Sequence, residues 1–179
     1  MRLLTFLTPL ALSAWTANAW NGGGYCLSDQ DAQSIADRST IFLEHLDIDA
    51  ANATAQGLFA DNLQEFGDSI NSLRGDALGT QVENGKAKYI EETLGSPPIP
   101  SITTIAIVHG CTDMVWQWQF DGIGTGQYRV RGFTLIEVDQ NKQVAYQYVE
   151  FNGLAWALDI GFTITPPATG PFSSSGGSK

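Results

Sequence analysis

The chain has 179 residues, of which 43% are hydrophobic and 16% are charged. This is the composition of a globular protein, and the length suits one domain with an appendage. The formal net charge is −10, from 9 Lys and Arg against 19 Asp and Glu. Because an acidic chain without a basic run repels phosphate backbones, we expect no nucleic-acid partner.

The start of the chain has the pattern of a secretory signal peptide. Met1-Arg2 is a short positive start, a mostly apolar run follows, and Ala17-Asn18-Ala19 fits the small-x-small cleavage pattern. The apolar run is too short for a transmembrane helix. We therefore expect cleavage after Ala19 and a secreted, extracellular protein with no membrane partner, the alternative being an uncleaved anchor.

Secretion decides how the two cysteines are interpreted. In an oxidising compartment Cys26 and Cys111 most simply form one disulfide. Such a bond closes a loop of roughly 85 residues, worth ~4 kcal/mol on the chain-entropy argument. Two separate buried thiols are the alternative. The single sequon, Asn52-Ala53-Thr54, marks a surface turn and makes Asn52 a candidate glycosylation site.

Helical patterns dominate the first half of the chain. Ser28 is a candidate N-cap with Asp31 in the capping-box position, and apolar residues then recur at helical spacing. Gly95 and the Pro97-Pro98 pair stop a later helical pattern. The expected elements are helices over 29–47, 49–57 and 85–94, with a strand or irregular segment over 58–66.

Strand patterns dominate the second half. Residues 112–121 alternate Met, Trp, Trp and Phe with Val, Gln and Gln, and a Gly-rich hairpin sequence follows over 121–127. The expected strands are 102–109, 112–121, 128–138 and 143–151, joined by short links as an antiparallel meander. This order predicts an α+β fold in which a sheet buries one face against the helices. The apolar run 154–164 is expected to pack back, and 165–179 to form a disordered Ser/Gly/Pro tail, so that the folded domain covers 20–164.

Helices followed by a long antiparallel sheet resemble the nuclear transport factor two-like superfamily, which includes ketosteroid isomerases, scytalone dehydratase and polyketide cyclases. The resemblance covers roughly residues 26–164 and is closer to secreted fungal members. It is carried by the segments Cys26-Leu27-Ser28-Asp29, His109-Gly110-Cys111-Thr112, Tyr128-Arg129-Val130-Arg131-Gly132-Phe133, Tyr148-Val149-Glu150-Phe151-Asn152 and Ala155-Trp156-Ala157-Leu158-Asp159. It implies a cone-shaped curved sheet around two or three helices, a small-molecule pocket at the open end, and homodimers through the outer sheet face.

Carboxylates are the candidate catalytic groups, because enzymes of this superfamily use a few polar groups in an apolar pocket, where desolvation shifts a carboxyl pKa. Glu150 shares a strand face with Tyr146 and Tyr148 and could act as a base; a salt bridge to Arg129 or Arg131 is the alternative. Asp61 and Glu65 lie where ketosteroid isomerases place their base, although an exposed strand explains both equally well.

The candidate ligand-binding residues are aromatic side chains and one histidine. Trp116 and Trp118 form an apolar strand face that is either simple core or a pocket wall. Phe133, Tyr148 and His109 complete the candidate set. His45, late in the first helix, is expected to meet the negative end of that helix instead of taking part in catalysis.

Several chemistries lack their sequence signals. Two histidines 64 residues apart make no metal-ligand set, no Gly-x-Ser-x-Gly nucleophile elbow occurs, and the Gly-rich segment lacks the features of a phosphate loop. We therefore expect no metal and no cofactor. Three functions remain open: a module that binds a small apolar or aromatic molecule, a cofactor-free isomerase, lyase or cyclase, and a filled scaffold that interacts with a host or cell-wall partner.

Overall fold

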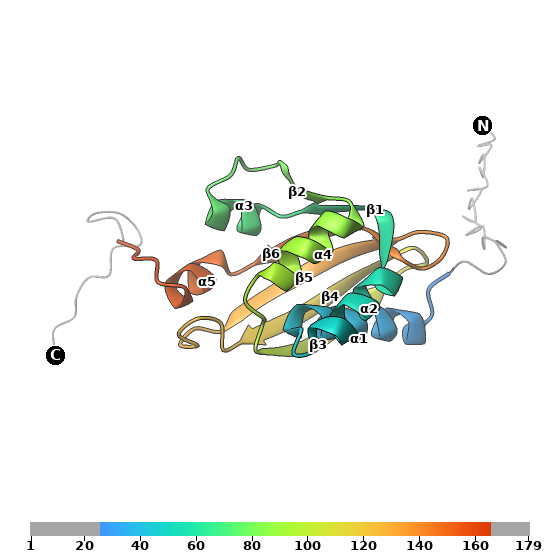
Figure 1. The fold of residues 1–179 in the computed structure, drawn as a ribbon, viewed down its shortest axis with the longest axis horizontal. Coiled ribbons are helices and arrows are strands. Elements are labelled where there is room, and N and C mark those ends of the chain that lie inside the picture. The colour runs from blue at the N-terminus through green and yellow to red at the C-terminus, as the bar shows by residue number, and fades with distance from the viewer. Residues whose placement is uncertain (1–25, 166–179) are drawn as a thin grey trace, which may run out of the picture.

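A curved sheet of six strands forms the framework, with helices over its inner face (Figure 1). The computed structural model describes residues 26–165; the expectations for the signal peptide over 1–19 and for the tail beyond 165 lie outside this range. Among the described residues, no helix is long and apolar enough to cross a membrane. The α+β fold predicted from the sequence is confirmed.

Local signals explain the first two helices. α1 (Asp29–Glu44) begins at Ser28, whose hydroxyl accepts from the N–H of Asp31 while the Asp31 carboxylate accepts from the N–H of Ser28. α2 (Ile48–Leu58) begins at Asp47, whose carboxylate accepts from the N–H of Ala50 at 3.0 Å. Each cap satisfies backbone donors that the first helical turn leaves free.

The sheet has the strand order β2-β1-β6-β5-β4-β3. The strands β3 to β6 pair antiparallel with their sequence neighbours, as the predicted meander requires. β1, however, lies parallel to β6, so the sheet is mixed. The strands are β1 (Phe59–Phe66), β2 (Gln81–Asn84), β3 (Ser101–His109), β4 (Asp113–Asp121), β5 (Val130–Val138) and β6 (Val144–Phe151).

The sequence patterns missed two elements and left a third as an apolar run. α3 (Asp68–Arg74) and β2 carry too few residues for a periodicity, while the apolar run near the C-terminus contains α5 (Gly153–Asp159). α4 (Lys86–Gly95) is the predicted third helix. Figure 1 shows α1, α2 and α4 over the sheet, with α3 and α5 at one end.

Alternation along the long strands separates the inner face of the sheet from the outer face. On β5, Val130, Thr134 and Ile136 are buried while Phe133 and Leu135 between them are exposed. Gly132 continues the inner row because a Cβ there would lie 2.5 Å from the Trp118 ring and 2.6 Å from the backbone oxygen of Glu150. The missing side chain at Gly132 therefore leaves room for Trp118.

The disulfide Cys26–Cys111 is present, which confirms that prediction. It joins the segment before α1 to the turn between β3 and β4, and beside it the N–H of Leu27 donates to the carbonyl of Cys111 at 2.8 Å. The bond thus fixes the start of α1 against the end of the sheet where the longest strands turn.

Replacing both cysteines by alanine should lower the free energy of unfolding. A crosslink over a sequence separation of 85 constrains the unfolded chain and contributes about 4 kcal/mol. Urea unfolding of Cys26→Ala/Cys111→Ala should therefore show a lower midpoint, with untreated and reduced wild-type protein as references. An unchanged midpoint would contradict the stabilising role.

Candidate functional site

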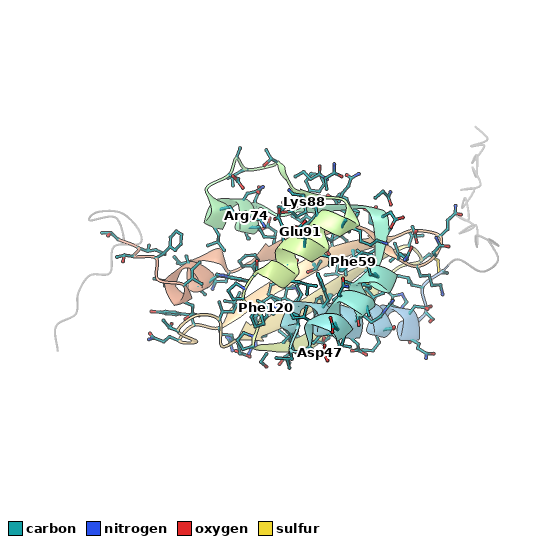
Figure 2. The ribbon with its side chains drawn as sticks, viewed as in Figure 1. Asp47, Phe59, Arg74, Lys88, Glu91 and Phe120 are labelled. Atoms are coloured by element: carbon teal, nitrogen blue, oxygen red, sulfur yellow. A yellow bond between two sulfur atoms is a disulfide. The ribbon has the colours of Figure 1, made fainter. Side chains whose placement is uncertain are left out.

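A cavity of about 400 Å³ lies between the helices and the inner face of the sheet. Side chains from α1, α3, α4, α5 and the sheet line it, and two of the lining residues, Phe59 and Phe120, are labelled in Figure 2. Pockets of this size bury most of the surface of a small ligand. The cavity is therefore the candidate functional site.

One wall of the cavity is aromatic. Trp118 stacks on Phe120 with ring centroids 3.8 Å apart, and Phe151 lies 4.9 Å from Trp156. The indole N–H of Trp118 donates to the Thr134 hydroxyl at 2.9 Å. Because that polar group is satisfied within the protein, the wall offers flat apolar surface to a ligand.

Glu65 supplies a carboxyl group at the opposite, polar side. It lies on β1, is 5% exposed, and lines the cavity. Its Oε1 accepts a hydrogen bond of 2.8 Å from the amide of Gln147 on β6. Burial raises the pKa of Glu65 from 4.5 to about 8, despite the opposing effect of the Gln147 hydrogen bond. At neutral pH this side chain is a carboxylic acid that can donate a hydrogen bond or a proton.

A phenol stands beside this acid. Tyr89 on α4 lines the cavity and is buried. Burial raises its pKa well above the ordinary value, the nearby Glu65 raises it further, and hydrogen bonds to Gln147 and Thr93 act against both. Tyr89 therefore stays a neutral hydroxyl, and Gln147 connects it to Glu65.

Glu83 is the second buried carboxyl group in the cavity lining, and its pKa is shifted in the opposite direction. It is paired in register with Glu65 across β1 and β2 and is 3% exposed. Arg74 lies 3.1 Å from its Oε1 and Lys88 2.9 Å from its Oε2. Burial acts to raise the pKa of Glu83, but the contacts with the cations Lys88 and Arg74 outweigh it and lower that pKa. Two neighbouring carboxyl groups thus hold different protonation states, a pattern typical of acid–base sites.

His45 also lines the cavity. It follows α1 as its C-cap and is buried, and its Nε2 lies 3.1 Å from the carbonyl oxygen of Ser96. Because a carbonyl only accepts, Nε2 carries a proton, and Nδ1 is the other polar atom of the ring. Among the described residues, this buried nitrogen has no hydrogen-bond partner. His45 therefore presents an unpartnered ring nitrogen inside the protein, in addition to its expected place at the helix end.

The structure places Glu150 at the start of α3, outside the cavity lining. Its carboxylate accepts from the N–H groups of Asp68 and Ser69, at 2.8 and 3.2 Å, and from the Ser69 hydroxyl. It therefore caps α3 from a distant strand, where the N-cap residue Gly67 has no side chain to do so. It does not line the cavity, and no salt bridge to Arg129 or Arg131 forms.

Asp61 also lies outside the cavity, although it shares β1 with Glu65. Its side chain is 93% exposed and pairs with Lys86 at 2.5 Å. The register of β1 against β6 shifts between Phe59 and Gln64, which interrupts the period-two alternation that would turn Asp61 inward.

The structure separates the five candidate ligand-binding residues. Trp116 and Trp118 are both buried core and cavity wall, so the two alternatives coincide. Phe133 is 51% exposed on the outer face, and Tyr148 lies on that face opposite Leu135. The Nε2 of His109 lies 2.9 Å from Oδ1 of Asp29, and this hydrogen bond raises the pKa of His109. His109 borders a separate surface cleft.

Sequence reasoning missed Gln147, Tyr89, His45, Glu83 and Arg74 as cavity residues. The alternation on β6 was the available signal, but its phase changes next to the register shift between Glu137 and Val138, so Val144 and Gln147 are both buried. Counting every second residue back from Glu150 therefore gave side chains on the outer face of the sheet and left out Gln147 on the inner face. Among residues 26–165, no cluster of His, Cys, Asp and Glu could hold a metal ion.

The comparisons with known proteins identify the family. The NTF2-like domain family matches residues 25–163. This chain is a member of the NTF2-like family. No curated protein matches it.

Solved structures share the fold at low sequence identity. A candidate SnoaL-like polyketide cyclase from Jannaschia sp. CCS1 has a TM-score of 0.54 and 15% identity, covering 80% of this chain and 100% of that one. A candidate isomerase from Bacillus subtilis has a TM-score of 0.54 and 17% identity, covering 73% and 95%. A SnoaL-like protein of unknown function from Burkholderia thailandensis has a TM-score of 0.53 and 17% identity, covering 71% and 98%. At these identities the likeness concerns the fold of this NTF2-like chain alone.

Replacing Glu65 by glutamine should remove part of the pH dependence of stability. Between pH 4.5 and about 8 the unfolded chain loses the Glu65 proton while the folded protein keeps it. The free energy of unfolding of the wild type should therefore fall with rising pH over this range and level off above it. Glu65→Gln should show a smaller fall, measured by urea unfolding at pH 5 to 9.

The matched control is Asp61→Asn, which removes a carboxylate at a position 93% exposed. It should keep the wild-type pH dependence. Parallel curves for the wild type and Glu65→Gln would contradict a protonated Glu65.

Proposed function

We propose that this protein binds a small, largely apolar molecule in the cavity, with the neutral Glu65 carboxyl donating a hydrogen bond to an acceptor on the ligand. The observation that carries the proposal is the cavity of about 400 Å³ with an aromatic wall and few polar groups. Apolar contact provides the driving force for binding, and the polar side orients the ligand. A scaffold filled by its own side chains is less compatible with a space of this size.

Binding of the neutral fluorescent probe N-phenyl-1-naphthylamine tests this proposal. Wild-type protein should enhance the fluorescence of the probe saturably. Val149→Trp adds a large side chain within the cavity lining and should weaken binding by about tenfold or more, equal to a loss of about 1.4 kcal/mol. Leu78→Trp adds a large side chain outside the cavity, in the turn before β2 where Leu78 is 64% exposed, and should bind as the wild type does. Equal binding by both variants, or no saturable binding, would contradict the proposal.

A second candidate function is cofactor-free proton transfer next to a carbonyl group, as in an isomerase, lyase or cyclase. One observation favours it: Glu65, with a pKa of about 8, is held beside the Tyr89 hydroxyl in a largely apolar cavity. A group whose pKa lies near the working pH is suited to both accepting and donating a proton.

Exchange of α-protons with D₂O in a panel of cyclic ketones, followed by NMR, tests the second candidate. Wild-type protein should accelerate exchange for at least one ketone, and Glu65→Gln should be slower by about 100-fold, the usual contribution of a general acid or base. Asp61→Asn should retain the wild-type rate. Acceleration that survives in Glu65→Gln would exclude Glu65 as the acid–base group.

We also propose that the chain is secreted and pairs with a second copy through the outer sheet face. The disulfide is compatible with an oxidising compartment, and Asn52 is exposed on α2. Val108 on β3, and Phe133 and Leu135 on β5, expose apolar side chains on that face, on the two strands that flank β4. Apolar surface of this kind is a common interaction site.

Native mass spectrometry of protein secreted from a eukaryotic host tests both points. The expected spectrum shows a chain without residues 1–19, a glycan on Asn52 and a dimer that Phe133→Lys shifts to monomer. A full-length mass would contradict cleavage, and a monomer for the wild type would contradict pairing.

A further inference from the structure

The polar side of the cavity holds a single cation. Among residues 26–165, Arg74 is the one Lys or Arg that lines the cavity. It lies in the last turn of α3 and its side chain is 43% exposed, so the guanidinium stands between the cavity and the solvent. Figure 2 shows Arg74 and Lys88 on the same side of the molecule. A positive charge at this place would be expected to attract anionic ligands.

The Arg74 guanidinium is already paired with acidic side chains of the protein. Its Nη1 donates to Glu83 Oε1 at 3.1 Å, and its Nη2 lies 3.5 Å from Glu92 Oε2. The other oxygen of Glu83 is 2.9 Å from Lys88, which also pairs with Glu92 at 3.3 Å. Two cations therefore face two carboxylates, and the cluster has no charge left to balance an incoming anion.

Because Glu83 is buried, its ion pair with Arg74 is harder to break than the pair between Arg74 and Glu92. The Glu83 side chain is 2% exposed, whereas that of Glu92 is 40% exposed. An ion pair that is partly withdrawn from water is screened less than one at the surface. Releasing Arg74 to a ligand would leave the Glu83 carboxylate buried without one of its two cations, which is costly.

We infer that Glu83 sets the charge selectivity of the cavity: by holding Arg74, it restricts the cavity to neutral ligands and excludes carboxylates. This inference rests on the proposed binding function and names the ligand class. A carboxylate that entered would lose its hydration, meet the charges of Glu83 and Glu92, and find no free cation. A neutral ligand of the same shape meets none of these costs, and the overall charge of −10 acts in the same direction.

The inference predicts a gain of function. In Glu83→Gln the side chain keeps its size but loses its charge, so Arg74 becomes available to a ligand carboxylate. The probes are 2-naphthamide and 2-naphthoate, which share one shape and differ in charge, each measured by displacement of bound N-phenyl-1-naphthylamine. In the wild type, naphthamide should bind at least about tenfold more tightly than naphthoate, a ratio equal to about 1.4 kcal/mol. In Glu83→Gln the ratio should shift toward naphthoate by about tenfold, the range of a charge-assisted hydrogen bond.

Two variants isolate the cause of the shift. Asp61→Asn removes the same charge from an exposed carboxylate that does not line the cavity, and should keep the wild-type ratio. Glu83→Gln/Arg74→Gln removes the released cation as well, and should lose the gain. If Glu83→Gln fails to fold by circular dichroism, Arg74→Gln in an otherwise wild-type chain takes its place and should not lower the affinity for naphthoate relative to naphthamide by more than about threefold.

The failures are distinguishable. Absence of saturable N-phenyl-1-naphthylamine binding overturns the proposed function and this inference with it. If that probe binds, the inference alone is overturned by equal wild-type affinities for the two naphthalene probes, by no displacement with naphthamide, by an unchanged ratio in Glu83→Gln, or by a large loss of naphthoate binding in Arg74→Gln.

Discussion

The pairing of β1 with β2 places two carboxyl groups side by side beneath the helices, and the rest of the site depends on how each is neutralised. Glu65 and Glu83 are opposite each other in register and both are buried. Two carboxylates this close cannot both ionise cheaply in a medium of low dielectric constant. The protein surrounds Glu83 with Arg74 and Lys88, while Glu65 receives only the amide of Gln147 and keeps its proton.

This division of charge connects the fold to the chemistry. Arg74 reaches Glu83 because α3 is held beside the sheet, and α3 is held there by Glu150, which caps the helix from β6. The same strand carries Gln147 toward Glu65 on its inner face. β6 therefore shapes the polar side of the cavity in two ways. Its outward carboxylate, Glu150, positions α3, and its inward amide, Gln147, bonds to Glu65. The aromatic wall on β4 is left to provide apolar contact.

The parts of the fold that local sequence determines were predictable, and so was the disulfide, because two cysteines allow a single pairing. The parts determined by other distant contacts were not predictable. The capping box at Ser28 and Asp31, the alternation of Trp116 and Trp118, and the pairing of Cys26 with Cys111 all appear in the structure as the sequence indicates. α3 has no local cap, so no local signal announces it. Glu65 was a candidate only by its position, and Asp61 was an equal one, because the register shift that separates them arises from the pairing of β1 with β6. Glu150 was misplaced for a similar reason, since its partners lie on α3, 81 and 82 residues away.

The most direct test of a neutral Glu65 beside an ionised Glu83 is a ¹³C NMR titration of the side-chain carboxyl groups, with the two resonances assigned by Glu65→Gln and Glu83→Gln. The expected result is a Glu65 carboxyl that titrates with a pKa of about 8 while Glu83 stays ionised from neutral pH down to below its ordinary pKa of 4.5. A Glu65 carboxyl that is already ionised at pH 6 would contradict the account, because the acid that orients or protonates a ligand would then be absent.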